Sequence, residues 1–135
     1  FKKEGDLSTP KGTFDLGFLY YRKDRNRTLI SKIRKKVIKK NMGWCDDIKS
    51  KKYNKQIYFP FKYSAEKLYR KDKIYDIFIN IKYNSNPTIK KRGSAIFLHL
   101  TNKKYKPTEG CVAIIKKDFL KILPLINKKT KISFI

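Results

Sequence analysis

The chain has 135 residues, and we expect residues 1–135 to form one domain. Apolar residues make up 40% and aromatic residues 14%, which is enough for a hydrophobic core and excludes an intrinsically disordered chain. The 35 basic and 11 acidic residues give a net charge of +24, which suits an anionic partner. Lys is spread along the chain and outnumbers Arg, so solvated surface positions explain this charge better than recognition of nucleic-acid bases. We therefore expect no nucleic-acid partner.

The sequence contains no recognisable membrane or metal-binding segment. No apolar run approaches the roughly 20 residues needed to cross a bilayer, so we expect no membrane span in this chain. No signal peptide is visible, and because the first residue is Phe1 we expect the natural protein to start further upstream. Two separated cysteines, Cys45 and Cys111, and a single histidine argue against a structural zinc site.

The first half of the chain is interpreted as strands separated by loops. Turn-forming residues predict a loop at 5–12, and alternating apolar residues predict a strand at 13–21. At 29–38 the apolar spacing is mixed, so a strand and a short amphipathic helix both remain open, with the strand favoured. The next predicted elements are a loop at 41–47, an extended segment at 56–61 and a single helical turn at 64–68.

The second half carries the clearest strand signals. The β-branched and aromatic residues of 74–83 predict a strand, and a turn follows at 84–87. Two apolar strands are expected at 94–100 and 111–115, then a helix that Asp118 opens and Pro124 shortens, then a closing strand at 131–135. These elements predict a mostly β fold, a β-sandwich-like arrangement of mixed sheets with two short helices.

The candidate chemistry lies on either side of one polar loop. His99, the only histidine, ends the strand before this loop, and Cys111 begins the strand after it. A neighbouring imidazole can take the thiol proton of a cysteine and leave a nucleophilic thiolate. Gly110 would let a carbonyl approach the backbone, where N–H groups of 109–111 could stabilise an oxyanion. From the residues alone, a structural His and an inert buried Cys remain equally open.

The segments 94–99 and 108–113 together resemble the signature of the L,D-transpeptidase catalytic domain. That signature is a His at a strand end, a loop, and then Ser or Thr, His, Gly and Cys. The segment 5–14 is similar to the Thr-Pro-x-Gly-x-Phe stretch of the family. The segments 43–47 and 64–66 look like those of a smaller bacterial subgroup.

The resemblance implies a two-step acyl transfer on peptidoglycan stem peptides, with no metal or organic cofactor. Cys111 would attack the carbonyl of the third residue of a tetrapeptide stem and release the terminal D-Ala. An amine of another stem or of a protein, or water, would then resolve the thioester, with His99 acting first as base and then as acid. The resemblance also implies a location in the periplasm or facing the cell wall.

Some residues depart from the family pattern. Glu109 stands where the family has its second His, and Ala113 stands where Arg or Asn is common. The loop between His99 and Cys111 is also shorter than usual. Thr108, Gly110 and the two reacting residues are kept, so the departures leave acyl transfer in place but put substrate choice and the oxyanion geometry in question.

Three further residues are candidates for substrate contact. Trp44 and Asp46 are placed in the predicted loop at 41–47, where Trp44 either contacts substrate or pins the loop onto the core. Arg92 could bind a stem carboxylate, or could belong to a solvated loop. Cys45 has no local base or glycine and is interpreted as a spectator that does not pair with Cys111.

Three other functions compete with the transpeptidase hypothesis. A hydrolase such as an L,D-carboxypeptidase would need only a different acceptor. A basic module that binds nucleic acid through phosphates and stacking would show a steep salt dependence and no need for Cys111. A catalytically inactive relative that binds an anionic cell-wall polymer is the third, and the sequence leaves the oligomeric state open.

Overall fold

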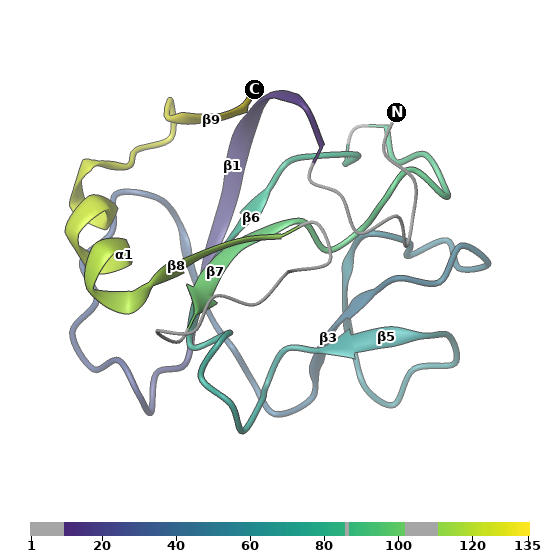
Figure 1. The fold of residues 1–135 in the computed structure, drawn as a ribbon. Helices are drawn as coiled ribbons and strands as arrows, with labels where there is room; N and C mark the ends of the chain where they lie inside the picture. Colours follow the sequence, from purple (N-terminus) through teal and green to yellow (C-terminus); the bar gives the residue numbers. More distant parts are fainter. Residues whose placement is uncertain (1–9, 86, 102–110) are drawn as a thin grey trace.

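The computed structural model describes residues 10–85, 87–101 and 111–135 (Figure 1). Its main element is a six-stranded mixed sheet in the order β2-β1-β6-β7-β8, with β9 paired to β1. The pairs β1–β2 and β7–β8 are parallel, and the other pairs in this sheet are antiparallel. The strands are β1 (Gly12–Tyr21), β2 (Lys35–Val37), β6 (Ile77–Ile81), β7 (Phe97–Thr101), β8 (Val112–Ile115) and β9 (Lys131–Phe134).

A smaller antiparallel sheet has the order β4-β3-β5. Its strands are β3 (Met42–Cys45), β4 (Gln56–Tyr58) and β5 (Ala65–Lys67). A Cβ on Gly43 would lie 2.6 Å from the Phe59 ring and 3.0 Å from the Glu66 carbonyl oxygen. Glycine is therefore the residue that lets the central strand β3 pack this closely.

The large sheet buries both of its faces. Alternate residues of the central strands point to opposite sides, so Ile77 and Ile79 join one core and Phe78 joins the other. The first core is aliphatic and packs against the helix, and the second is aromatic and packs against the small sheet. In Figure 1 the helix and the small sheet accordingly lie on opposite sides of β1, β6 and β7.

The helix follows β8 without a break. Helix α1 (Lys116–Ile122) carries Asp118 in its first turn and continues into the 3-10 turn η1 (Leu123–Leu125), which contains Pro124. Proline lacks the N–H that would extend the α-helical ladder, so the predicted shortening is confirmed. Phe119 and Leu123 are fully buried in the aliphatic core.

An arginine clamp fixes the connection between β5 and β6. Arg22 donates to the Arg70 carbonyl oxygen at 2.8 Å and pairs with Asp24. Arg25 forms an ion pair of 2.6 Å with the buried carboxylate of Asp76 and also donates to the Asp72 carbonyl oxygen. Because planar guanidinium groups carry several donors, two arginines satisfy much of this connection's backbone.

The mostly β fold with mixed sheets is confirmed, three local predictions are wrong, and the strand favoured at 29–38 is right in part. The segment 41–47 contains strand β3 instead of a loop, since its residues are buried and hydrogen-bonded on both edges. The segment 64–68 contains strand β5 instead of a helical turn, since β3 supplies its partner. Within the described part of the chain there is accordingly one α-helix where two short helices were expected. At 29–38 only Lys35–Val37 is a strand, although Leu29 and Ile33 are buried.

Among the helices in the described ranges, none has the length and apolar character needed to cross a membrane.

Candidate active site

His99 and Cys111 lie on the same face of two adjacent strands. His99 on β7 pairs with Ala113 in the parallel register of β7 and β8. Cys111 precedes Ala113 by two residues, so its side chain points to the same side of the sheet. This is the face that carries the aromatic core, against which Cys111 packs. The two strands that flank residues 102–110 therefore lie side by side, as predicted.

The sulfur of Cys111 has two backbone neighbours. It lies 3.0 Å from the Ala95 carbonyl oxygen, to which the thiol donates. It also lies 3.4 Å from the Phe97 nitrogen, whose N–H points at the sulfur. The sulfur thus has an acceptor for its thiol form and a donor for its thiolate form.

The imidazole of His99 is buried and held by the backbone. Its Nδ1 lies 2.7 Å from the Leu100 carbonyl oxygen, which can only accept, so Nδ1 carries the proton. Nε2 is then the basic nitrogen. Burial lowers the pKa of His99, and the charge of Arg70 lowers it further, while the Leu100 carbonyl and Asp72 act in the opposite direction. The ring is therefore a neutral base at neutral pH.

Tyr75 lies beside both residues. Its ring meets the His99 ring edge to face, with the centroids 5.5 Å apart, and its hydroxyl donates to the Glu66 carboxylate. Burial raises the pKa of Tyr75, and the negative charges of Glu66 and Cys111 raise it further, so the phenol stays protonated. The guanidinium of Arg70 lies 5.3 Å from the centre of the same ring.

This geometry can support nucleophilic chemistry. A half-buried thiol and an oriented neutral imidazole share one sheet face, and a backbone carbonyl sets the tautomer of the imidazole. Among the described residues, no cluster of three or more His, Cys, Asp and Glu side chains could hold a metal ion.

The family model of the YkuD L,D-transpeptidase catalytic domain matches residues 1–133. The chain belongs to this family. Neither the curated proteins nor the solved structures yielded a significant match. Membership implies an activity of the L,D-transpeptidase class and a cell-wall substrate of the peptidoglycan type.

The motif residues expected around the oxyanion lie outside the part of the chain that the structure describes. These are Thr108, Glu109 and Gly110. Their roles in this L,D-transpeptidase domain stay predictions.

Trp44 occupies the core of the domain. It is 5% exposed, its ring meets the Phe97 ring at 5.1 Å, and its Nε1 donates to Asn54. This is the packing role that the sequence analysis kept open beside substrate contact. Asp46 is half-buried and accepts a hydrogen bond of 2.7 Å from Ser64, which ties the end of β3 to the start of β5.

Cys45 is fully buried on β3. Its sulfur lies 3.9 Å from the Asp47 carbonyl oxygen, and no disulfide joins it to Cys111 in this structure.

Arg92 is exposed and borders a hollow beside the sheet. The hollow has a volume of about 840 Å³, and its lining includes Gly17, Asn80 and Lys82 as well as Arg92. Asn80 pairs with Phe97, the residue whose N–H points at the Cys111 sulfur. The hollow is therefore separated from Cys111 by one strand, β7.

Sequence reasoning missed four residues of this neighbourhood. Tyr75 was assigned no site role because its segment, 74–83, indicates only a strand, and Arg70 was assigned none because no motif includes it. Asn54 and Ala95 were also missed, although both have a positive φ, of 57° and 53°. An Asn in a turn is a recognisable signal for the left-handed conformation, whereas an Ala in an apolar strand is not.

Proposed function

We propose that this domain is a cysteine acyltransferase acting on peptidoglycan tetrapeptide stems, with Cys111 as nucleophile and His99 as base. The observation that carries the proposal is the shared sheet face of these two residues, with Nδ1 of His99 held by the Leu100 carbonyl. Family membership supplies the reaction class. The proposal treats residues 1–135 as one catalytic unit without a metal or organic cofactor.

The first half-reaction forms a thioester. The thiol of Cys111 passes its proton to Nε2 of His99 while the sulfur attacks the carbonyl carbon of the third stem residue. The C–N bond to the terminal D-Ala breaks, and His99 returns the proton to the departing amine. We propose that N–H groups at 109–111, which follow Thr108 and include those of Glu109 and Gly110, stabilise the oxyanion of the intermediate.

The second half-reaction consumes the thioester. An acceptor amine gives a proton to His99 and attacks the acyl carbon, the S–C bond breaks, and the sulfur regains the proton. An amine from a second stem yields a 3-3 cross-link, and an amine on a protein yields an attached protein. Water in the same place would make the domain an L,D-carboxypeptidase, which is the competing function on this site.

The hollow beside β6 is a candidate for the donor stem. It lies one strand away from Cys111, and it brings the cations of Lys82 and Arg92 toward one space. Arg can bind a carboxylate through two parallel hydrogen bonds. We propose that Arg92 binds a carboxylate of the donor stem there. Trp44 and Asp46 would not contact the stem, and would instead stabilise the small sheet.

A location facing the cell wall follows from the same proposal. Peptidoglycan is an extracytoplasmic polymer, and the net charge of +24 would attract its anionic groups.

The test is intact mass spectrometry after incubation with a disaccharide-tetrapeptide. We expect an adduct of the stem minus its terminal D-Ala, and either a 3-3 dimer or free tripeptide as the product. Cys111→Ala should abolish both, whereas Cys45→Ala should retain them. Arg92→Gln should raise the stem concentration for half-maximal acylation about tenfold, the size of one lost charged hydrogen bond, and Lys121→Gln on helix α1 should not.

The two outcomes separate the functions. A dimer identifies a transpeptidase, and tripeptide alone identifies a carboxypeptidase. A folded, reduced protein that gives neither adduct nor product would refute the proposal.

A further inference from the structure

We propose that Asn54 is a positioning residue for Cys111, because its side-chain amide holds Ala95 in the conformation that aims the Ala95 carbonyl at the thiol. The inference rests on the proposed role of Cys111 as nucleophile. It concerns how the sulfur is held before substrate arrives.

Asn54 is a buried junction between distant parts of the chain. Its Oδ1 accepts from Trp44 Nε1 at 3.0 Å and from the Ala95 N–H at 3.1 Å. Its Nδ2 donates to the carbonyl oxygens of Tyr83 and Asn84, at 3.0 and 2.8 Å. Two donors face the oxygen and two acceptors face the nitrogen, so the partners fix the orientation of the amide.

Ala95 has a backbone conformation that needs support. Its φ is 53°, in the left-handed region that a residue with a Cβ rarely adopts. The hydrogen bond from its N–H to Asn54 Oδ1 is buried and holds it there. On the other side of the same residue, the carbonyl oxygen lies 3.0 Å from the Cys111 sulfur.

The consequence concerns the sulfur itself. A carbonyl oxygen accepts from a thiol but repels a thiolate, whereas the Phe97 N–H, 3.4 Å away on the same sulfur, favours the thiolate. Asn54 therefore keeps Cys111 as an oriented thiol until His99 takes the proton. Within the described ranges, Tyr75 from the β5–β6 connection also interacts with the sulfur, and Glu66 and Arg70 in turn contact Tyr75.

The test measures the rate at which iodoacetamide alkylates Cys111 across pH, in a Cys45→Ala background so that one thiol remains. The variant is Asn54→Gly, because glycine accepts the φ of 57° and removes only the side chain. We expect alkylation on the acid side of the profile to rise about fivefold, the change in equilibrium expected from one lost hydrogen bond. Acyl-enzyme formation should fall about tenfold, because the sulfur loses its orientation.

Tyr53→Phe is the matched control. The Tyr53 hydroxyl accepts from the Gly93 N–H at 3.0 Å, so this variant removes a bond to the same segment without touching Ala95. Its alkylation profile should match that of the parent. An unchanged profile in folded Asn54→Gly, or an equal shift in Tyr53→Phe, would overturn the proposal.

A spectroscopic measurement covers the case in which Asn54→Gly does not fold. In the Cys45→Ala parent, the infrared S–H stretching band of Cys111 should lie at a lower frequency than the band of a non-bonded thiol in an apolar solvent. A band at the position of a non-bonded thiol would also overturn the proposal. The alkylation and infrared readouts need no reaction with a stem peptide, so a failure of the acyltransferase function is distinguishable from a failure of this inference.

Discussion

The third partner in the arrangement around His99 is a main-chain carbonyl. Many Cys–His pairs orient their base with a side chain, which a sequence can reveal by its type. Here the Leu100 carbonyl performs that task, at 2.7 Å from Nδ1. Every residue carries such a carbonyl, so the sequence could predict the nucleophile and the base but not the group that orients the base. The same limit applies to Ala95, whose carbonyl contacts the Cys111 sulfur.

Burial of His99 makes stability depend on pH in a defined window. Its pKa is lowered in the folded protein, while an unfolded histidine titrates near a pKa of about 6.5. As the pH falls below about 6.5, the unfolded chain binds a proton that the folded chain rejects, so the free energy of unfolding decreases. We expect the urea midpoint to drop between about pH 7.5 and about pH 5.5, and to drop less in His99→Gln.

The comparison with His99→Gln isolates this one group. The carboxylates with lowered pKa values, Asp15, Asp24, Asp47 and Asp72, titrate below this window. An equal drop in both proteins would mean that His99 does not cause it.

At the scale of the element, sequence prediction succeeded where β-branched and aromatic residues dominate a strand. The strands predicted at 13–21, 74–83, 94–100 and 111–115 follow from their β-branched and aromatic residues, and each overlaps an observed strand. Strands β3 and β5 were missed because turn formers and helix formers dominate them, and only their mutual pairing makes them extended. That pairing is a tertiary contact, which local residue propensities cannot predict.

The arginine clamp consists of tertiary contacts, which the local sequence pattern also could not predict. Asp76 is 3% exposed and pairs with Arg25, so Asp76→Ala leaves a guanidinium without its carboxylate. Removing one partner of a buried pair costs about 3 kcal/mol, and urea unfolding should show a loss of that order. Asp24→Ala is the control, because Asp24 is 55% exposed in its pair with Arg22 and should cost below about 1 kcal/mol. Equal losses in the two variants would contradict the clamp's role.

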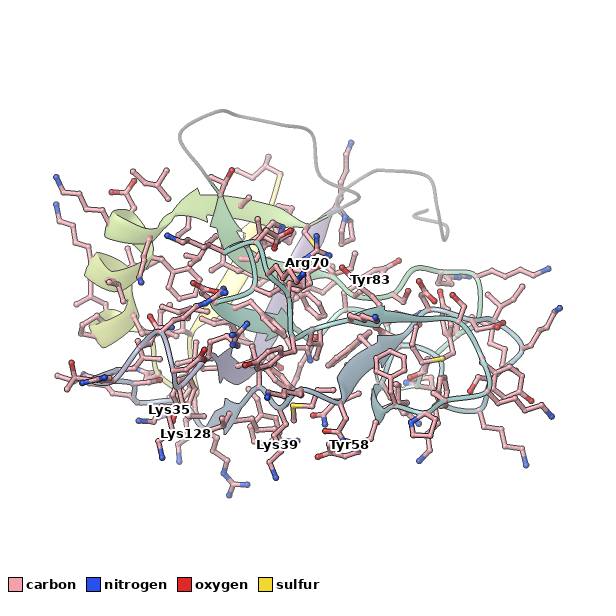
Figure 2. All side chains as sticks on the ribbon, turned by 90° about the horizontal axis from the view of Figure 1, so that it is seen from below. Lys35, Lys39, Tyr58, Arg70, Tyr83 and Lys128 are labelled. Atoms are coloured by element: carbon pink, nitrogen blue, oxygen red, sulfur yellow. The ribbon has the colours of Figure 1, made fainter. Side chains whose placement is uncertain are left out.

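For the molecule as a whole, the main electrostatic feature is repulsion among its own cations. In Figure 2 the side chains of Lys35, Lys39 and Lys128 extend outward along one edge of the view. The chain has 35 basic and only 11 acidic residues, so most of its cations have no acidic residue to pair with. The large positive charge therefore opposes folding in addition to attracting anionic partners.

Screening should therefore stabilise the protein. Raising NaCl from about 10 mM to about 150 mM shortens the Debye length from about 30 Å to about 8 Å, which weakens long-range repulsion. We expect the melting temperature to rise by about 3 °C or more, a shift equivalent to about 1 kcal/mol for a chain of this size. The variant Lys39→Gln/Lys128→Gln/Lys129→Gln should show a smaller rise. A melting temperature that is flat or falls with salt would refute the idea.

The pairing of β1 with β9 has a consequence for biosynthesis. Gly12 is opposite Phe134 in the sheet, so β1 is completed by residues that are synthesised long after it. Until residue 134 has been added, β1 lacks the partner of its first four residues, and the ring of Phe14 lacks Phe134 beside it. The nascent chain therefore cannot close its sheet before residues 131–134 have been synthesised and have emerged, which keeps the first half of β1 without its partner until then.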